Sequence, residues 1–126
     1  MTALPDTNVI LRYLLGDVPD QYQDAEDLFE KVRTGKEKAL IMESVLVECV
    51  YVLLKFYKAP KKEITEKLSA LLHYRGIVNK NAAEFITALS LFEKKNIDIF
   101  DCLIYVKSRK DNYRLFSFDD KLKRMK

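Results

Sequence analysis

The sequence predicts one helix-rich α/β domain, spanning residues 1–126, with a three-layer, doubly wound and mostly parallel sheet. Short apolar runs that suit strands alternate with longer segments that suit helices, and this alternation is typical of right-handed βαβ units. The chain has 126 residues, which is the size of a single domain. Only three glycines and three prolines interrupt it, so helices are expected to dominate.

Each expected element has a local justification. Strands are expected at four short apolar runs, namely residues 3–6, 39–42, 77–78 and 114–118. Helices are expected at seven segments, namely residues 9–15, 20–34, 44–58, 60–76, 81–95, 98–110 and 120–125. Gly16 and Gly35 stand just past the first two helices, and Pro60 falls in the first turn of the fourth. Asn81 followed by Glu84 resembles a capping box.

The composition excludes several classes of protein. No run of 18 apolar residues is present, and the first residues carry no basic segment, so we expect neither a membrane span nor a signal peptide. Cys49 and Cys102 lie in apolar stretches without C-x-x-C spacing, which favours buried thiols in a cytoplasmic protein. His73 is the one histidine, so a zinc site of Cys and His is disfavoured.

Charge is unevenly distributed along the chain. The net charge is +3. Residues 1–34 carry three basic and seven acidic groups (net −4), whereas residues 102–126 carry eight and three (net +5). A basic C-terminal segment suits a polyanionic partner such as a nucleic acid. A solvated face with a charged tail is the alternative explanation.

Four of the 19 acidic residues stand in unusual surroundings. Glu48 is the one charged residue in the apolar stretch 45–54, so it needs a cation, hydrogen-bond donors, a wet cleft or a place at the helix rim. Asp6 and Asp119 end predicted strands, although Asp6 also suits a helix N-cap. Asp101 is flanked by apolar residues.

Two further acidic residues lie beside these four. Asp98 comes one helical turn before Asp101, and it is the better candidate for capping their helix. Asp120 is a candidate cap for the last helix.

The four acids are expected to share one edge of the sheet, because the carboxyl ends of parallel strands meet there. Carboxylates that share a small pocket raise one another's pKa. A hard divalent cation removes that conflict, and Mg²⁺ and Mn²⁺ prefer oxygen ligands. Water bound to such an ion becomes a nucleophile near neutral pH, and this chemistry needs no histidine.

Four pieces of the chain together resemble a PIN domain, and most of all the compact VapC-type toxin ribonucleases. They are residues 6–14, 44–53, 99–104 and 117–121. The resemblance implies an Mg²⁺- or Mn²⁺-dependent endoribonuclease whose acidic quartet falls on four residues, namely Asp6, Glu48, Asp101 and Asp119. Asp98 is a possible fifth acid. The polar residues that would orient the acids are Thr7 or Asn8, and Ser117.

The resemblance also implies partners. Such proteins usually form homodimers and are usually inhibited by a cognate antitoxin protein that covers the acidic cleft. In the family the final strand follows the last acid by more residues than remain here, so we expect that strand to be missing, cut off or supplied by a neighbour. The basic residues that would contact the RNA substrate are Arg12, Lys107, Arg109, Lys110 and Arg114.

Two other functions are weighed against the nuclease. The first is a non-catalytic PIN-like scaffold that binds RNA or protein, although such a module has no need of four clustered carboxylates. The second is a phosphotransfer or phosphatase domain, which also uses aspartates at strand ends. The first aspartate here is followed by Thr7 and Asn8 rather than by the D-x-D pattern of such phosphatases. The RNA that is cleaved, and the choice between toxin and RNA-processing factor, stay open.

Overall fold

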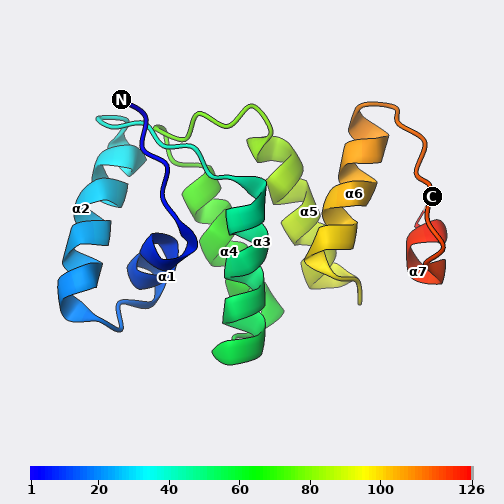
Figure 1. Ribbon diagram of the computed structural model, residues 1–126, viewed down its shortest axis with the longest axis horizontal. Coiled ribbons are helices and arrows are strands. Elements are labelled where there is room, and N and C mark those ends of the chain that lie inside the picture. The colour runs from blue at the N-terminus through cyan, green and yellow to red at the C-terminus, as the bar shows by residue number, and fades with distance from the viewer. Residues whose placement is uncertain (126) are drawn as a thin grey trace.

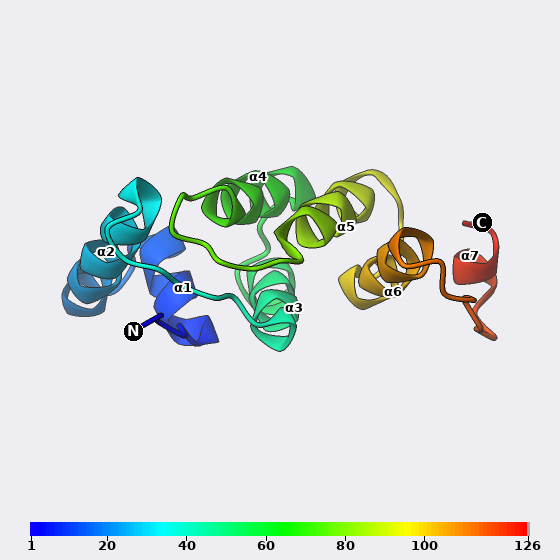
Figure 2. The same ribbon diagram turned by 90° about the horizontal axis from the view of Figure 1, so that it is seen from above.

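The computed structural model describes residues 1–125 and is built mainly of helices (Figure 1). The helices in chain order are α1 (Thr7–Leu15), α2 (Pro19–Thr34), α3 (Glu43–Tyr51), the π-helix η1 (Val52–Phe56), α4 (Lys61–Leu72), α5 (Ala82–Lys94), α6 (Ile99–Lys110) and α7 (Asp120–Lys123). All seven expected helices are therefore present, with small shifts at their ends. Viewed from above, α2 lies at one end of the molecule and α7 at the other (Figure 2).

Three of the four expected strands are reduced to single-residue pairs. Ala39 forms parallel bridges with Ala3 on one side and with Ile77 on the other. The backbone N–H of Ala3 donates to Lys38 at 2.8 Å, and that of Ala39 donates to Gly76 at 2.9 Å. These bridges have the parallel sense that the sequence predicts, but no extended strand and no three-layer sheet is seen in residues 1–125.

The fourth expected strand, residues 114–118, does not form here. The segment follows α6 and reaches α7 without a bridge to any described residue. Phe116 and Phe118 remain 71% and 86% exposed, and they pack edge-to-face on each other. The apolar run that suggested a strand thus has no partner strand within residues 1–125, and a strand requires one.

Aspartates begin three of the helices. The side chains of Asp6, Asp98 and Asp119 accept hydrogen bonds from backbone N–H groups in the first turns of α1, α6 and α7, respectively. The predicted cap at Asp98 is confirmed. The predicted cap at Asp120 is wrong, because Asp119 accepts from Lys121 at 2.8 Å and from Leu122 at 3.2 Å.

The expected capping box at the start of α5 is also wrong. The side-chain oxygen of Asn81 accepts a hydrogen bond from Asn79 rather than from the helix backbone. Glu84 is nearly buried and forms ion pairs with Lys107 and Lys110 of α6. These pairs join α5 to α6, so the charge that suggested a cap contributes to packing instead.

The expected helix over residues 44–58 widens into a π-helix after Tyr51. The N–H of Tyr57 donates to the carbonyl of Val52 five residues earlier, at 3.1 Å. Turns of this type are rare and are frequently found at functional sites. Lys55 lies in this widened turn, and its side chain is exposed.

The core lies where the apolar faces of the helices meet, and its largest fully buried side chains include Phe29, Leu46 and Phe85. Cys49 and Cys102 are both fully buried free thiols, as the sequence predicts. Among the described residues, no helix is both long and apolar enough to cross a bilayer. Helices α1 and α3 pack together, and α6 packs on α5 and touches α3. These contacts fix the positions of the acidic residues.

Candidate active site

The first pair of acids lies where α1 meets α3. Asp6 precedes α1, and its Oδ1 accepts from the N–H of Val9 at 3.0 Å. The hydroxyl of Thr7 donates to Oε1 of Glu48, which lies in α3. Burial raises the pKa of the Cys49 thiol to about 12, and the charges of Glu48 and Asp6 add to the rise. Thr7 therefore joins the first acid's loop to the second acid's helix.

Glu48 is more exposed than its apolar neighbours suggest. The sequence places it in a helix that is apolar on most sides, but the structure leaves its side chain on the exposed face of α3. Leu46, Cys49 and Val50 are the residues of this helix that face the core. Because the carboxylate faces water and accepts the Thr7 hydroxyl, it has no unpaired buried charge.

The second group of acids lies at the start of α6. Asp98 uses both carboxylate oxygens: Oδ1 accepts from the N–H of Phe100 at 2.9 Å, and Oδ2 accepts from the hydroxyl of Tyr51 at 2.5 Å. Asp101 lies one turn further along and is half-buried. Burial raises the pKa of the Asp101 carboxyl, and the negative charges of Asp98 and Asp119 raise it further. Asp101 and Asp119 are therefore electrostatic neighbours.

Tyr51 links the two groups. It lies one helical turn after Glu48 on α3, and its hydroxyl reaches Asp98 at the start of α6. Residues three apart on a helix share one face. The acids thus follow one another across the surface, from α1 over α3 to α6 and the C-terminal segment. Tyr51 was not among the predicted site residues, although its spacing of three residues from Glu48 is a signal that could have identified it.

The acids do not form a compact metal site in this arrangement. Within residues 1–125, no three acidic, cysteine or histidine side chains come close enough together to hold an ion. The chemistry of the donors suits a hard cation, because all of them are carboxylates. Their spacing does not suit a single ion, because Asp6 and Glu48 form one group while Asp98, Asp101 and Asp119 form another.

The expected orienting residues have three different positions. Thr7 contacts Glu48, as described above. The hydroxyl of Ser117 accepts a hydrogen bond from the N–H of Asp119 at 3.0 Å, so it fixes the backbone at that acid. Asn8 instead faces a hollow beside α2 that is also lined by Arg12 and Gln21, and it makes no side-chain hydrogen bond to a described residue.

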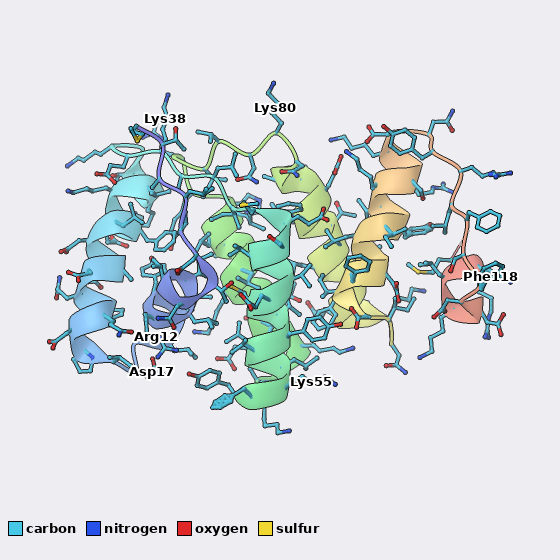
Figure 3. The ribbon with its side chains drawn as sticks, viewed as in Figure 1. Arg12, Asp17, Lys38, Lys55, Lys80 and Phe118 are labelled. Atoms are coloured by element: carbon cyan, nitrogen blue, oxygen red, sulfur yellow. The ribbon has the colours of Figure 1, made fainter. Side chains whose placement is uncertain are left out.

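The five basic residues expected to contact RNA differ in their burial and in their ion pairs. Arg12 is nearly buried, lies 3.3 Å from Asp17 and donates to the hydroxyl of Tyr57 at 3.1 Å. Figure 3 labels Arg12 and Asp17. Lys107 and Lys110 pair with Glu84.

The two remaining basic residues, Arg109 and Arg114, are exposed. Arg114 lies over the ring of Phe116, at 5.6 Å from its centroid. Arg109 lines a shallow hollow between α5 and α6.

Comparison with known protein families identifies the class of protein. The chain belongs to the PIN domain family, whose model matches residues 3–126, and the resemblance found in the sequence is thereby confirmed. PIN domains are single α/β domains, and this one is rich in helix.

A curated protein is also similar to this chain. The VapC ribonuclease of Aquifex aeolicus (strain VF5) is 31% identical over 124 residues, which cover 97% of this chain and 90% of that protein. Comparison with solved structures gave no match. Membership of the PIN family sets aside the phosphotransfer interpretation of the strand-end aspartates.

Proposed function

We propose that this chain is a VapC-type endoribonuclease that acts as the toxin of a toxin–antitoxin pair in the cytoplasm. The observation that carries the proposal is the similarity to a VapC ribonuclease over almost the full length of both chains. The arrangement of the acids supports it, because the four quartet residues lie on surfaces that adjoin through Thr7 and Tyr51. A non-catalytic scaffold is the alternative that the experiments below must exclude.

The acids are proposed to use Mg²⁺ or Mn²⁺, which would supply an activated water for cleavage of the phosphodiester bond. The raised pKa of Asp101 supports this part of the proposal, since burial is its main cause and the charges of Asp98 and Asp119, which a divalent cation would neutralise, add to it. We assign no bond-breaking step to the ion, because the described positions keep the acids in two groups.

The roles of the protein's own residues are easier to define. Asp6, Glu48, Asp101 and Asp119 form the proposed catalytic set, and Thr7 and Ser117 hold two of them in place. Asp98 is less suited to bind an ion, because Phe100 and Tyr51 already use both of its oxygens. We further propose that the three parallel segments at Ala3, Ala39 and Ile77 are the centre of the family's three-layer sheet.

Partners are proposed on the same basis. A homodimer and a cognate antitoxin are expected for a VapC-type protein. Exposed apolar side chains gather beside α6, where Phe100, Ile104, Tyr113 and Phe116 line a cleft of about 500 Å³. Clustered exposed apolar groups of this kind mark surfaces that bind other proteins.

The test is cleavage of a panel of labelled single-stranded RNAs by the wild type and by Asp6→Asn, with Mg²⁺, with Mn²⁺ and with EDTA. Asparagine is also a good N-cap, so the variant should keep α1 and lose only the carboxylate charge. We expect metal-dependent cleavage that the substitution abolishes. Asp20→Asn, which removes an acid from α2, is the matched control and should cleave normally.

Thermal unfolding with added Mg²⁺ provides a second test that needs no substrate. An ion that binds the folded chain raises the melting temperature in proportion to RT ln(1 + [L]/Kd). We expect a rise for the wild type and a smaller one for Asp101→Asn. Full cleavage by Asp6→Asn would refute the proposed mechanism. A melting temperature that stays unchanged when Mg²⁺ or Mn²⁺ is added would favour the scaffold.

A further inference from the structure

A hollow of about 280 Å³ lies beside the second group of acids, and its lining includes Tyr51, Asp98 and three lysines. The lysines come from three separate elements: Lys55 from η1, Lys61 from the start of α4 and Lys121 from α7. Segments far apart in the sequence therefore bring positive charge to one place, next to residues of the proposed active site. None of these three lysines is among the basic residues predicted to contact RNA.

Two of these lysines are held in place by neutral groups. The ammonium of Lys61 lies 4.7 Å from the centroid of the Phe92 ring. The ammonium of Lys121 donates to the backbone carbonyl of Asn96 at 3.2 Å. Neither contact neutralises the charge, and within residues 1–125 none of the three lysines forms an ion pair with an acidic residue. Their charges are therefore available to an anion.

Asp98, the one acidic residue that lines the hollow, does not prevent an anion from binding there. Both oxygens of Asp98 already accept hydrogen bonds, from Tyr51 and from Phe100. Three lysines against one carboxylate leave a net positive charge at this spot.

The geometry points to this lysine hollow, formed by Lys55, Lys61 and Lys121, as a binding subsite for backbone phosphates of the RNA, next to the cleavage site. The inference rests on the proposed function for the identity of the polyanion. Lysine is a good point-charge partner for phosphate, and contacts of this kind position a strand without reading its sequence. The hollow adjoins Tyr51 and Asp98, so a strand held there passes close to Asp101 and Glu48.

The lysines of the hollow also differ from the basic residues that the sequence predicted to contact RNA, because three of those residues form ion pairs. Lys107 and Lys110 are paired with Glu84, and Arg12 is paired with Asp17. Figure 3 shows Lys55 at the lower edge of the molecule, and Lys38 and Lys80 at the upper edge. Lys38 and Lys80, with Lys36, are three exposed lysines and provide a control set of the same charge, whereas in the hollow Lys55 and Lys121 are exposed and Lys61 is half-buried.

The test measures binding of a fluorescent single-stranded RNA in EDTA, by anisotropy, as a function of salt concentration. The hollow variant replaces Lys55, Lys61 and Lys121 with glutamine, and the control variant replaces Lys36, Lys38 and Lys80 in the same way. Each phosphate contact contributes about 0.7 to the slope of log K against log salt for single strands. We expect the hollow variant to lower that slope by about two and to weaken binding about ten-fold, with little change for the control.

Each outcome decides the inference. Equal loss of slope in both variants would mean that net charge alone acts, and this would overturn the subsite. Displacement of the RNA by inorganic phosphate at a concentration equal to that of the RNA would also overturn the subsite. The hollow would then bind a free anion as well as it binds a strand. Lys55→Gln alone, at an exposed position, should lower the slope by about 0.7 even if the triple variant fails to fold.

The same assay separates this inference from the proposed function. Binding in EDTA does not depend on cleavage. If RNA binds through the hollow and is never cut with either metal, the nuclease proposal fails and the subsite stands. If RNA is cut and the slope of the hollow variant matches that of the wild type, the subsite fails and the nuclease stands.

Discussion

The hydrogen bond between Tyr51 and Asp98 should stabilise the fold, because it crosses from α3 to α6 at 2.5 Å. Replacing Tyr51 with phenylalanine removes only the hydroxyl and keeps the ring. A hydrogen bond to a charged group contributes about 1.5–3 kcal/mol when it is sheltered. Tyr51 is 39% exposed. Solvent therefore weakens the bond, and we expect a loss of about 1 kcal/mol in the free energy of unfolding.

That loss corresponds to a fall in melting temperature of roughly 3–6 °C for a chain of this size. Calorimetry or circular dichroism would measure it. Asp98→Asn keeps a side chain that can cap α6, so it serves as the second arm of a double-mutant cycle. The cycle should give a coupling energy of about 1 kcal/mol between the two positions. A coupling energy near zero would show that the bond does not stabilise the packing of α3 on α6.

The pH dependence gives an independent check on the same bond. The hydroxyl donates to Asp98, which raises the pKa of Tyr51 above its ordinary value near 10. A raised folded-state pKa contributes stability that is complete below the unfolded value and declines as the pH rises through the folded value. The difference in stability between the wild type and Tyr51→Phe should therefore be constant below pH 10 and shrink above it. A difference that grows at alkaline pH would contradict the assignment.

Three further changes test other parts of the structure. Gly76→Ala would place its Cβ 2.1 Å from the carbonyl oxygen of Glu37, so we expect a loss of about 3 kcal/mol or more, seen as a chain that is unfolded or insoluble at growth temperature. Asp119→Ala should cost about 1 kcal/mol in chemical denaturation because it removes the cap of α7, while Asp120→Ala should cost less than half of that. Glu84→Gln should lower the melting temperature, since the two lysines of α6 lose their nearly buried partner, and restoration of stability at high salt would instead point to simple charge repulsion.

Local signals in the sequence predicted the helices well. Gly16 and Gly35 end α1 and α2 in the left-handed conformation, and Asp98 caps α6. These residues act within one or two turns, so their effect can be read from spacing alone. The segment 114–118 has an equally clear local pattern, but a strand also needs a neighbour, and no local signal shows whether one is available.

The site was predictable where it depends on residue type, and not where it depends on contacts between distant segments. Asp6, Glu48, Asp101 and Asp119 were singled out because carboxylates are unusual at predicted strand ends and inside apolar helices, and their catalytic role stays a prediction. The contacts of Tyr51 with Asp98 and of Glu84 with two lysines join residues far apart in the chain. The π-helix also gave no signal, because its sequence has the composition of an ordinary helix.

The docking of α7 has a practical consequence for how the protein is purified. Leu122 is buried, and Lys121 is tied to the carbonyl of Asn96, so this short helix lies against the start of α6 and beside the acids. A polyhistidine tag joined after residue 126 would begin three residues beyond α7 and would place metal-chelating side chains near Asp101 and Asp119. Met1 is fully exposed at the other end of the molecule (Figure 1), so an N-terminal tag is the safer choice for every metal titration.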